Sequence, residues 1–149
     1  MDKPIISYHI LNADNSYTKQ NSVYAGTYTG DEPLEVRLRI WNNYRGIENV
    51  EDLQNFNLVL RFLTEEDNAL LKYIDLIDEK HNIQIPGTIE ENAFVGIFFE
   101  PVVLSGSANT GSDEYNGNYI DIKISFKAGA NAYLKDHDLK SLVLDIVEL

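Results

Sequence analysis

The feature that most constrains this chain is the alternation of apolar and polar residues with a period of two. It is clearest in "LEVRLRIW" at residues 34–41, and it recurs at 56–63, 119–126 and 142–149. In the first segment, one face carries Leu34, Val36, Leu38 and Ile40, and the other carries Glu35, Arg37, Arg39 and Trp41. Strands that bury one face and expose the other have this pattern, and antiparallel sheets are their usual setting. A parallel α/β sheet would instead alternate wholly apolar strands with long amphipathic helices.

Further strands are predicted at 5–11, 82–85 and 93–104. Gly96 and Pro101 interrupt the last of these, so a bulge or a sheet edge is expected there. A chain of 149 residues fits one domain, and most of its prolines and glycines fall between the predicted strands. The sequence therefore predicts one all-β domain over residues 1–149. We expect seven to nine strands in an antiparallel two-sheet, immunoglobulin-like sandwich, with room for one short helix.

Residues 64–80, "TEEDNALLKYIDLIDEK", fit two structures. Leu70, Leu71, Ile74 and Ile77 share one helical face. However, Tyr73 and Leu76 fall off that stripe, and "LLKYIDLI" also reads as a strand. We favour the strand, joined as a hairpin to the preceding one through a turn at "EEDN".

The net charge of −12 is concentrated in residues 48–100, where twelve acidic and three basic residues give a balance of −9. An acidic surface repels nucleic-acid phosphates and anionic membranes, so neither is expected as a partner. Acidic charge also keeps a protein soluble, and most of it is expected to serve that purpose. No apolar run approaches the ~20 residues that a membrane-spanning helix needs.

The residue types that catalysis or metal binding would require are either absent or far apart in the sequence. The chain has no cysteine, and His9, His81 and His137 lie in three distant segments without a nucleophile motif. No phosphate-binding glycine motif and no zinc-ligand spacing occurs. We therefore expect no catalysis, no cofactor and no metal centre. Calcium at the oxygen-rich stretches 65–67 or 113–118 is the minor alternative.

Aromatic residues in polar surroundings are the main candidates for contact with a partner, because tyrosine and tryptophan suit both protein interfaces and sugar stacking. The candidate interaction residues are Trp41, Tyr44, Tyr115, Asn116, Tyr24 and Tyr28. Alternatively, such residues cap the ends of a sandwich, and Trp41 at the end of its strand is the strongest case for a lid on the core. Asn116–Gly117 predicts a type I′ hairpin turn. The preceding loop 105–113 is expected to be a contact loop that orders against a neighbour, and a plain flexible connection is the alternative.

Two segments resemble immunoglobulin-like modules: "LEVRLRIWNNYRGIENVEDLQNFNLVLRF" at 34–62 and "IPGTIEENAFVGIFF" at 85–99. In the first, a strand ends in Asn-Asn before an acidic turn, and in the second, an Ile-Pro turn precedes an apolar strand. The chain is short, cysteine-free and rich in asparagine, tyrosine and isoleucine, and in this it is similar to small structural proteins of bacteriophage particles. This resemblance implies a non-catalytic virion component, in a decoration, tail or collar, that docks on other virion proteins and on copies of itself.

The alternative function is an extracellular carbohydrate-binding module. In that interpretation Trp41, Tyr44 and Tyr115 stack against a glycan. An enzymatic function is the least favoured of the three.

Overall fold

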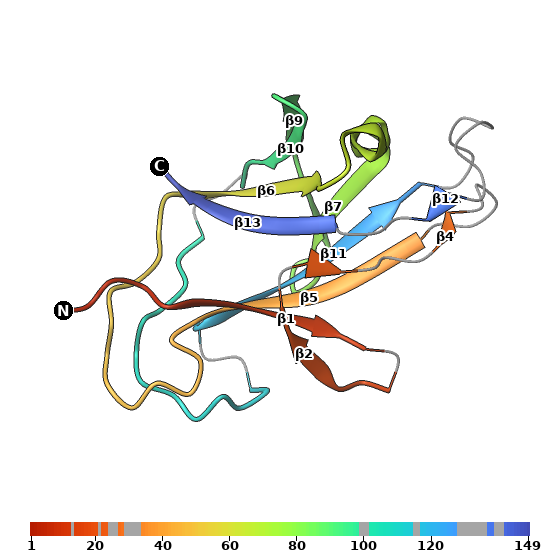
Figure 1. The fold of residues 1–149 in the computed structure, drawn as a ribbon. Helices are drawn as coiled ribbons and strands as arrows, with labels where there is room; N and C mark the ends of the chain where they lie inside the picture. Colours follow the sequence, from red (N-terminus) through yellow and green to blue (C-terminus); the bar gives the residue numbers. More distant parts are fainter. Residues whose placement is uncertain are drawn as a thin grey trace.

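The computed structural model describes residues 1–12, 14–20, 22–23, 27–28, 34–98, 102–114, 117–127, 137–138 and 142–149. Two antiparallel sheets form a sandwich, and one short helix lies at one end of it (Figure 1). The predicted all-β class is confirmed. The arrangement is compatible with an immunoglobulin-like fold.

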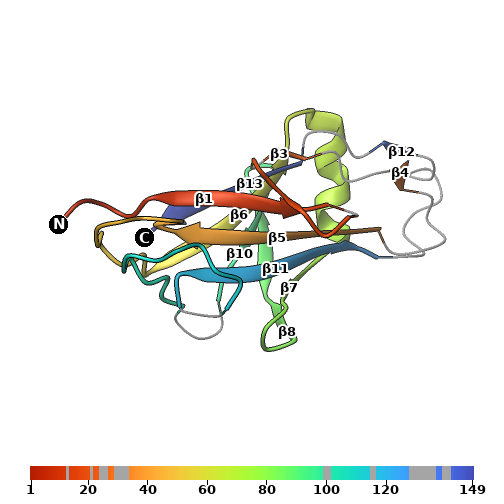
Figure 2. The same ribbon diagram turned by 90° about the horizontal axis from the view of Figure 1, so that it is seen from below.

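The first sheet has six strands in the order β2-β1-β5-β11-β7-β8. In chain order they are β1 (Ile6–Leu11), β2 (Tyr17–Lys19), β5 (Leu34–Asn42), β7 (Ile74–Asp78), β8 (Ile83–Ile85) and β11 (Tyr119–Phe126). The two longest strands, β5 and β11, lie side by side at its centre, as Figure 2 shows.

The second sheet has five strands in the order β3-β13-β6-β10-β9. In chain order they are β3 (Ser22–Val23), β6 (Phe56–Phe62), β9 (Gly87–Glu90), β10 (Ala93–Gly96) and β13 (Leu142–Glu148). A separate pair joins β4 (Thr27–Tyr28) to β12 (His137–Asp138). The described residues thus hold thirteen strands rather than seven to nine, because strands of only two to four residues extend the sheets and form the pair.

The hydrophobic core lies between the two sheets and follows the predicted alternation. From the first sheet it takes Val36, Leu38, Ile40, Ile120, Ile122, Ile124 and Phe126, and from the second Phe56, Leu58, Leu60, Phe62, Leu142 and Leu144. Each large apolar side chain removed from water contributes roughly 1.5–3 kcal/mol. The alternation therefore selects which face of each strand turns inward.

The favoured strand over 64–80 is wrong for its first half. Residues Glu65–Tyr73 form a 3₁₀ helix, η1, and only Ile74–Asp78 form a strand. The predicted hairpin is also wrong, since β7 pairs with β11 and β8 in the first sheet while β6 belongs to the second. The consecutive residues Leu70 and Leu71 are both fully buried. A strand would turn one of them outward, whereas helical geometry directs both toward the core.

The predicted strand over 93–104 is also too long, because β10 ends at Gly96. Leu104 forms only an isolated bridge with Leu53, and Pro101 lies outside the described residues. Gly96 marks no sheet edge, since β10 lies between β6 and β9. A β-carbon at Gly96 would stand 2.7 Å from Leu76 Cδ2, so glycine allows the two sheets to approach closely there.

The turn predicted at Asn116–Gly117 lies partly outside the described residues, because Asn116 is not among them; β11 itself pairs with β5 and β7. Gly117 does adopt a left-handed conformation, with φ of 84°. A two-residue hairpin turn lies between β9 and β10. Its residues Glu91 and Asn92 have φ of 49° and 62°, as a type I′ turn requires.

Candidate functional site

Two loops lie side by side at one end of the first sheet, where β5 ends and β11 begins (Figures 1 and 2). We call them the loop pair: residues 43–52 and residues 105–114. Backbone hydrogen bonds join them directly, from Val50 N–H to Gly106 O at 2.8 Å and from Asn109 N–H to Gly46 O at 3.0 Å.

Buried asparagine amides hold the first half of the loop pair. Asn42 Nδ2 donates to the carbonyl oxygens of Glu51 and Leu104, both at 3.0 Å. Asn43 Nδ2 donates to Gly106 O at 2.9 Å and to a carbonyl within its own loop. Both side chains are buried, so each hydrogen bond replaces one that water would otherwise provide.

A third buried amide fixes the second loop to the start of β11. Asn118 Nδ2 donates to Ser105 O and Ser107 O, both at 2.8 Å. Gly106 is required here, because a β-carbon at this position would overlap the carbonyl oxygen of Val50. The predicted contact loop 105–113 is therefore ordered by its own chain, and it needs no neighbour for this.

Next to the loop pair, the outer face of the first sheet carries an aromatic and ionic cluster. We call it the outer cluster: His9, Tyr17, Arg39, Trp41, Tyr44 and Tyr119. The register of the sheet explains it, since His9 pairs with Arg39 across β1 and β5, and Tyr119 pairs with Trp41 across β5 and β11. Residues directly opposite one another in neighbouring strands share a face.

Arg39 is the centre of the outer cluster. Its guanidinium carbon lies 3.9 Å from the centre of the Tyr119 ring and 5.2 Å from that of Tyr17, which is cation–π geometry. Its nitrogens pair with Asp121 at 2.7 Å and with Asp113 of the loop pair at 3.1 Å. Burial lowers the pKa of Arg39, but hydrogen bonding and attraction to Asp121 outweigh burial and hold that pKa above its ordinary value.

The surroundings of His9 disfavour its charged form. Burial lowers its pKa, and the nearby charges of Lys19, Arg39 and Arg45 lower it further. Its ring meets Tyr44 edge-on at 4.4 Å, and its Nε2 is buried without a hydrogen-bond partner among the described residues. The neutral imidazole is therefore the form that fits this site.

Of the three predicted interaction residues that the structure describes, it brings together Trp41 and Tyr44, whose ring centres lie 4.9 Å apart. Trp41 is 1% exposed, so it offers no stacking face to a glycan, and it lies on the outer side of the first sheet, away from the sandwich core. Tyr44 is half-buried. Tyr28 lies in β4, at the other end of the molecule (Figure 1). Tyr24, Tyr115 and Asn116 lie outside the described residues.

The interaction residues predicted from the sequence do not include Arg39, His9, Tyr119 or the buried asparagines. Arg39 occupies an outward position in the alternating pattern, which predicts contact with solvent. The signal that could have found it is a basic and an acidic residue, Arg39 and Asp121, at outward positions of two predicted strands. The register needed to pair them is not contained in the pattern of either strand alone.

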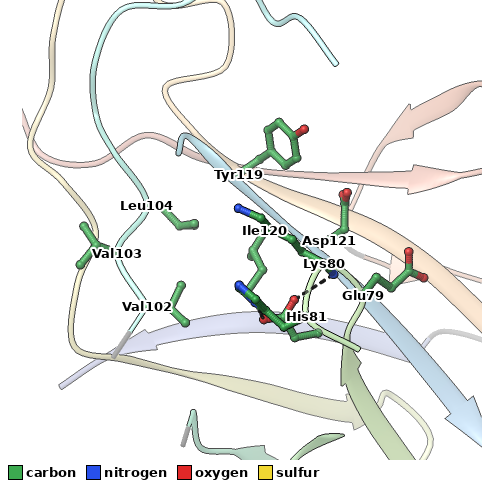
Figure 3. Close-up of a pocket in the computed structure, with 10 residues that line it drawn as sticks. Glu79, Lys80, His81, Val102, Val103, Leu104, Tyr119, Ile120 and Asp121 are labelled. Atoms are coloured by element: carbon green, nitrogen blue, oxygen red, sulfur yellow. Dashed lines mark hydrogen bonds and ion pairs between the residues drawn. The ribbon is translucent and has the colours of Figure 1, made fainter. Parts of the chain in front are cut away.

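A cavity of about 290 Å³ opens beside the loop pair (Figure 3). It lies between the turn after β7, residues 102–104 and the start of β11, with Val102, Leu104 and Ile120 as apolar lining. Its three carboxylates are already engaged: Asp78 pairs with His81 at 2.8 Å, Glu79 pairs with Arg37 at 2.7 Å, and Asp121 pairs with Arg39. The cavity offers space for an apolar group rather than a free acid or base.

Among the residues that the structure describes, no three acidic or histidine side chains are grouped so that they could hold a metal ion. No helix in this part of the chain is long and apolar enough to cross a membrane. Comparisons with protein-family models, with curated proteins and with solved structures find no match for this chain.

Proposed function

We propose that this chain is a non-catalytic structural protein of a bacteriophage particle, and that it docks on other proteins of the particle through the loop pair. The particle assignment rests on the similarity of this short, cysteine-free chain, rich in asparagine, tyrosine and isoleucine, to small structural proteins of bacteriophage particles, and the two-sheet sandwich is compatible with it. The docking role rests on a separate observation at the tip of the loop pair.

That observation is an apolar side chain presented by an ordered loop. Ile47 is 94% exposed, although buried amides fix its loop on both sides. Arg45 is exposed next to it, and Tyr44 is half-buried. Tyrosine and arginine are enriched at the centres of interfaces. Since the loop is already ordered, association does not have to supply the free energy of ordering it.

The particle assignment is tested by quantitative mass spectrometry of purified particles from the source that encodes the chain. The expected result is this chain at a fixed small-integer ratio to a major particle protein. Its absence from washed particles, with the chain found free in the lysate, would refute the assignment.

The docking surface is tested by Ile47→Ser, measured as binding of the purified variant to particles that lack the chain. Truncating a hot-spot residue at the centre of an interface costs about 2 kcal/mol or more, so the affinity is expected to fall about thirtyfold or further. Leu63→Ser is the matched control, because Leu63 is 60% exposed and lies at the opposite end of β6. Equal effects of the two substitutions would remove the loop pair from the proposal.

A further inference from the structure

One extended segment, residues 83–90, forms an outer edge of both sheets. Its first half, β8, is the last strand of the first sheet, and its second half, β9, is the last strand of the second. Only Pro86 separates them. Within the described part of the chain, β8 pairs only with β7, and β9 pairs only with β10, so the other side of the segment is open.

The hydrogen-bond pattern identifies which backbone groups face that open side. In an antiparallel pair, residues that exchange hydrogen bonds alternate with residues whose N–H and C=O point away. Ile97 N–H donates to Pro86 O at 2.8 Å, so the pair Pro86–Ile97 belongs to the bonded set. Counting along the register, Gly87 and Ile89 belong to the other set. Their backbone groups therefore point outward.

This edge carries two exposed apolar side chains among polar ones. Ile83 is 55% exposed and Ile89 is 49% exposed. Proteins protect exposed edges with very short strands, with charged side chains and especially lysine, with proline, or with a covering segment, because unpaired edges attract other strands. Here both strands are short and Glu90 is charged, but Pro86 falls between the two strands, and β9 itself contains no lysine and no proline.

The acidic charge of the edge indicates the charge of a partner that would bind there. Residues 81–98 contain two acidic residues, Glu90 and Glu91, and neither lysine nor arginine. The whole chain carries −12, so a second copy or an acidic strand would meet like charge. A basic strand would instead gain attraction from the same charges.

We propose that residues 83–90 form a docking edge that binds an extended, lysine- or arginine-rich segment of a partner protein as an added strand. Main-chain hydrogen bonds at Gly87 and Ile89 provide the pairing, and Glu90 and Glu91 favour the basic partner. This inference extends the proposed function, because it names a second docking surface and the chemistry of its partner. It does not depend on Ile47 or on the loop pair.

The first test titrates the full chain with a labelled eight-residue peptide of alternating valine and lysine, followed by fluorescence anisotropy. Two matched peptides serve as controls: one with glutamate in place of lysine, and one with alternate backbone amides methylated. We expect saturable binding of the lysine peptide, with at least tenfold weaker binding of both controls. Equal binding of the methylated peptide would mean charge attraction without strand pairing and would overturn the proposal.

The second test places the binding on the edge. Ile89→Pro removes an outward N–H that the β9–β10 pairing does not use, and Ile89→Ala keeps that N–H. The proline variant is expected to weaken binding of the lysine peptide at least tenfold, and the alanine variant by about threefold or less. Similar losses in both would overturn the proposal. Hydrogen exchange on the unmodified chain gives an independent measurement: bound peptide should slow exchange at Gly87 and Ile89, and unchanged exchange there would also overturn it.

The proposal can fail separately from the proposed function. Ile47→Ser is expected to leave peptide binding unchanged, and Ile89→Pro is expected to leave the loop pair intact. A concentration-dependent dimer that Ile89→Pro abolishes would identify a second copy as the occupant and would overturn the basic-segment proposal.

Discussion

Three buried asparagines, Asn42, Asn43 and Asn118, account for the order of the loop pair. An asparagine amide donates two hydrogen bonds through its nitrogen and also accepts hydrogen bonds at its oxygen, so one residue can hold carbonyl groups from two segments at once. Asn42 does this most fully, because it also accepts a hydrogen bond from Ile5 N–H at 2.9 Å. Apolar side chains of the same size would leave these backbone groups buried and unpaired.

Asn42→Ala is therefore expected to lower the free energy of unfolding by about 3 kcal/mol, because it leaves several buried polar groups without a hydrogen-bond partner. Urea denaturation followed by circular dichroism measures this change. Asn49→Ala is the control, since Asn49 is exposed and accepts one hydrogen bond from Ala108 N–H. Its expected cost is about 0.5 kcal/mol, and a similar cost for both variants would contradict the role assigned to Asn42.

His9 is expected to make stability depend on pH. Its pKa in the folded chain lies below the ordinary value of about 6.5, so the unfolded chain binds the proton more readily. The stabilisation is complete above about pH 6.5 and is lost as the pH falls toward the folded-state pKa. The cations facing it are Lys19 on β2, Arg39 on β5 and Arg45 in the loop pair.

Comparing the unfolding free energy at pH 7.5 and pH 5 for the chain and for His9→Gln isolates this contribution. The unsubstituted chain is expected to lose more stability on acidification than the variant, because glutamine has no proton to gain. Parallel pH profiles would show that His9 does not titrate in the way its surroundings imply.

At the scale of elements, one segment connects the two sheets and another holds the second sheet together. The helix η1 carries the chain from β6 in the second sheet to β7 in the first, and it buries Leu70 and Leu71 on the way. The strand β13 lies between β3 and β6, so it belongs to the interior of the second sheet (Figure 1). Loss of an interior strand exposes the edges of both neighbours.

Deletion of residues 142–149 is expected to abolish cooperative unfolding, because it removes Leu142 and Leu144 from the core together with the ladder to β6. Deleting only residues 148–149 is the control, since Leu149 is 80% exposed. Near-ultraviolet circular dichroism during thermal unfolding distinguishes the two. A folded chain without residues 142–149 would contradict this account of the second sheet.

At the scale of the whole molecule, the sandwich presents two separate surfaces with different properties. The loop pair is ordered by side-chain hydrogen bonds and presents one exposed isoleucine, Ile47. The edge 83–90 presents unpaired backbone groups beside acidic side chains. The net charge of −12 acts on both, because it disfavours association with like-charged proteins and favours basic ones. Increasing salt is therefore expected to weaken association at the edge more than at Ile47.

The sequence alone determined the class of fold and the inward faces of the long strands. Alternation is a local property, so it could be read for Leu38 and Ile40 or for Ile122 and Ile124 without knowing what they pack against. Charge and the absence of cysteine are likewise properties of the chain itself.

Only the tertiary structure decided which outward residues are buried and which segments meet. The pattern placed Arg39 and Trp41 on the solvent side of their strand, but the register with β1 and β11 and the covering loop pair bury both. Tertiary structure also decided the conformation of Leu70 and Leu71. Their local sequence fits a strand, but they lie in the helix that connects β6 of the second sheet to β7 of the first. Register and crossing depend on contacts between residues far apart in the chain, and no window of neighbouring residues contains them.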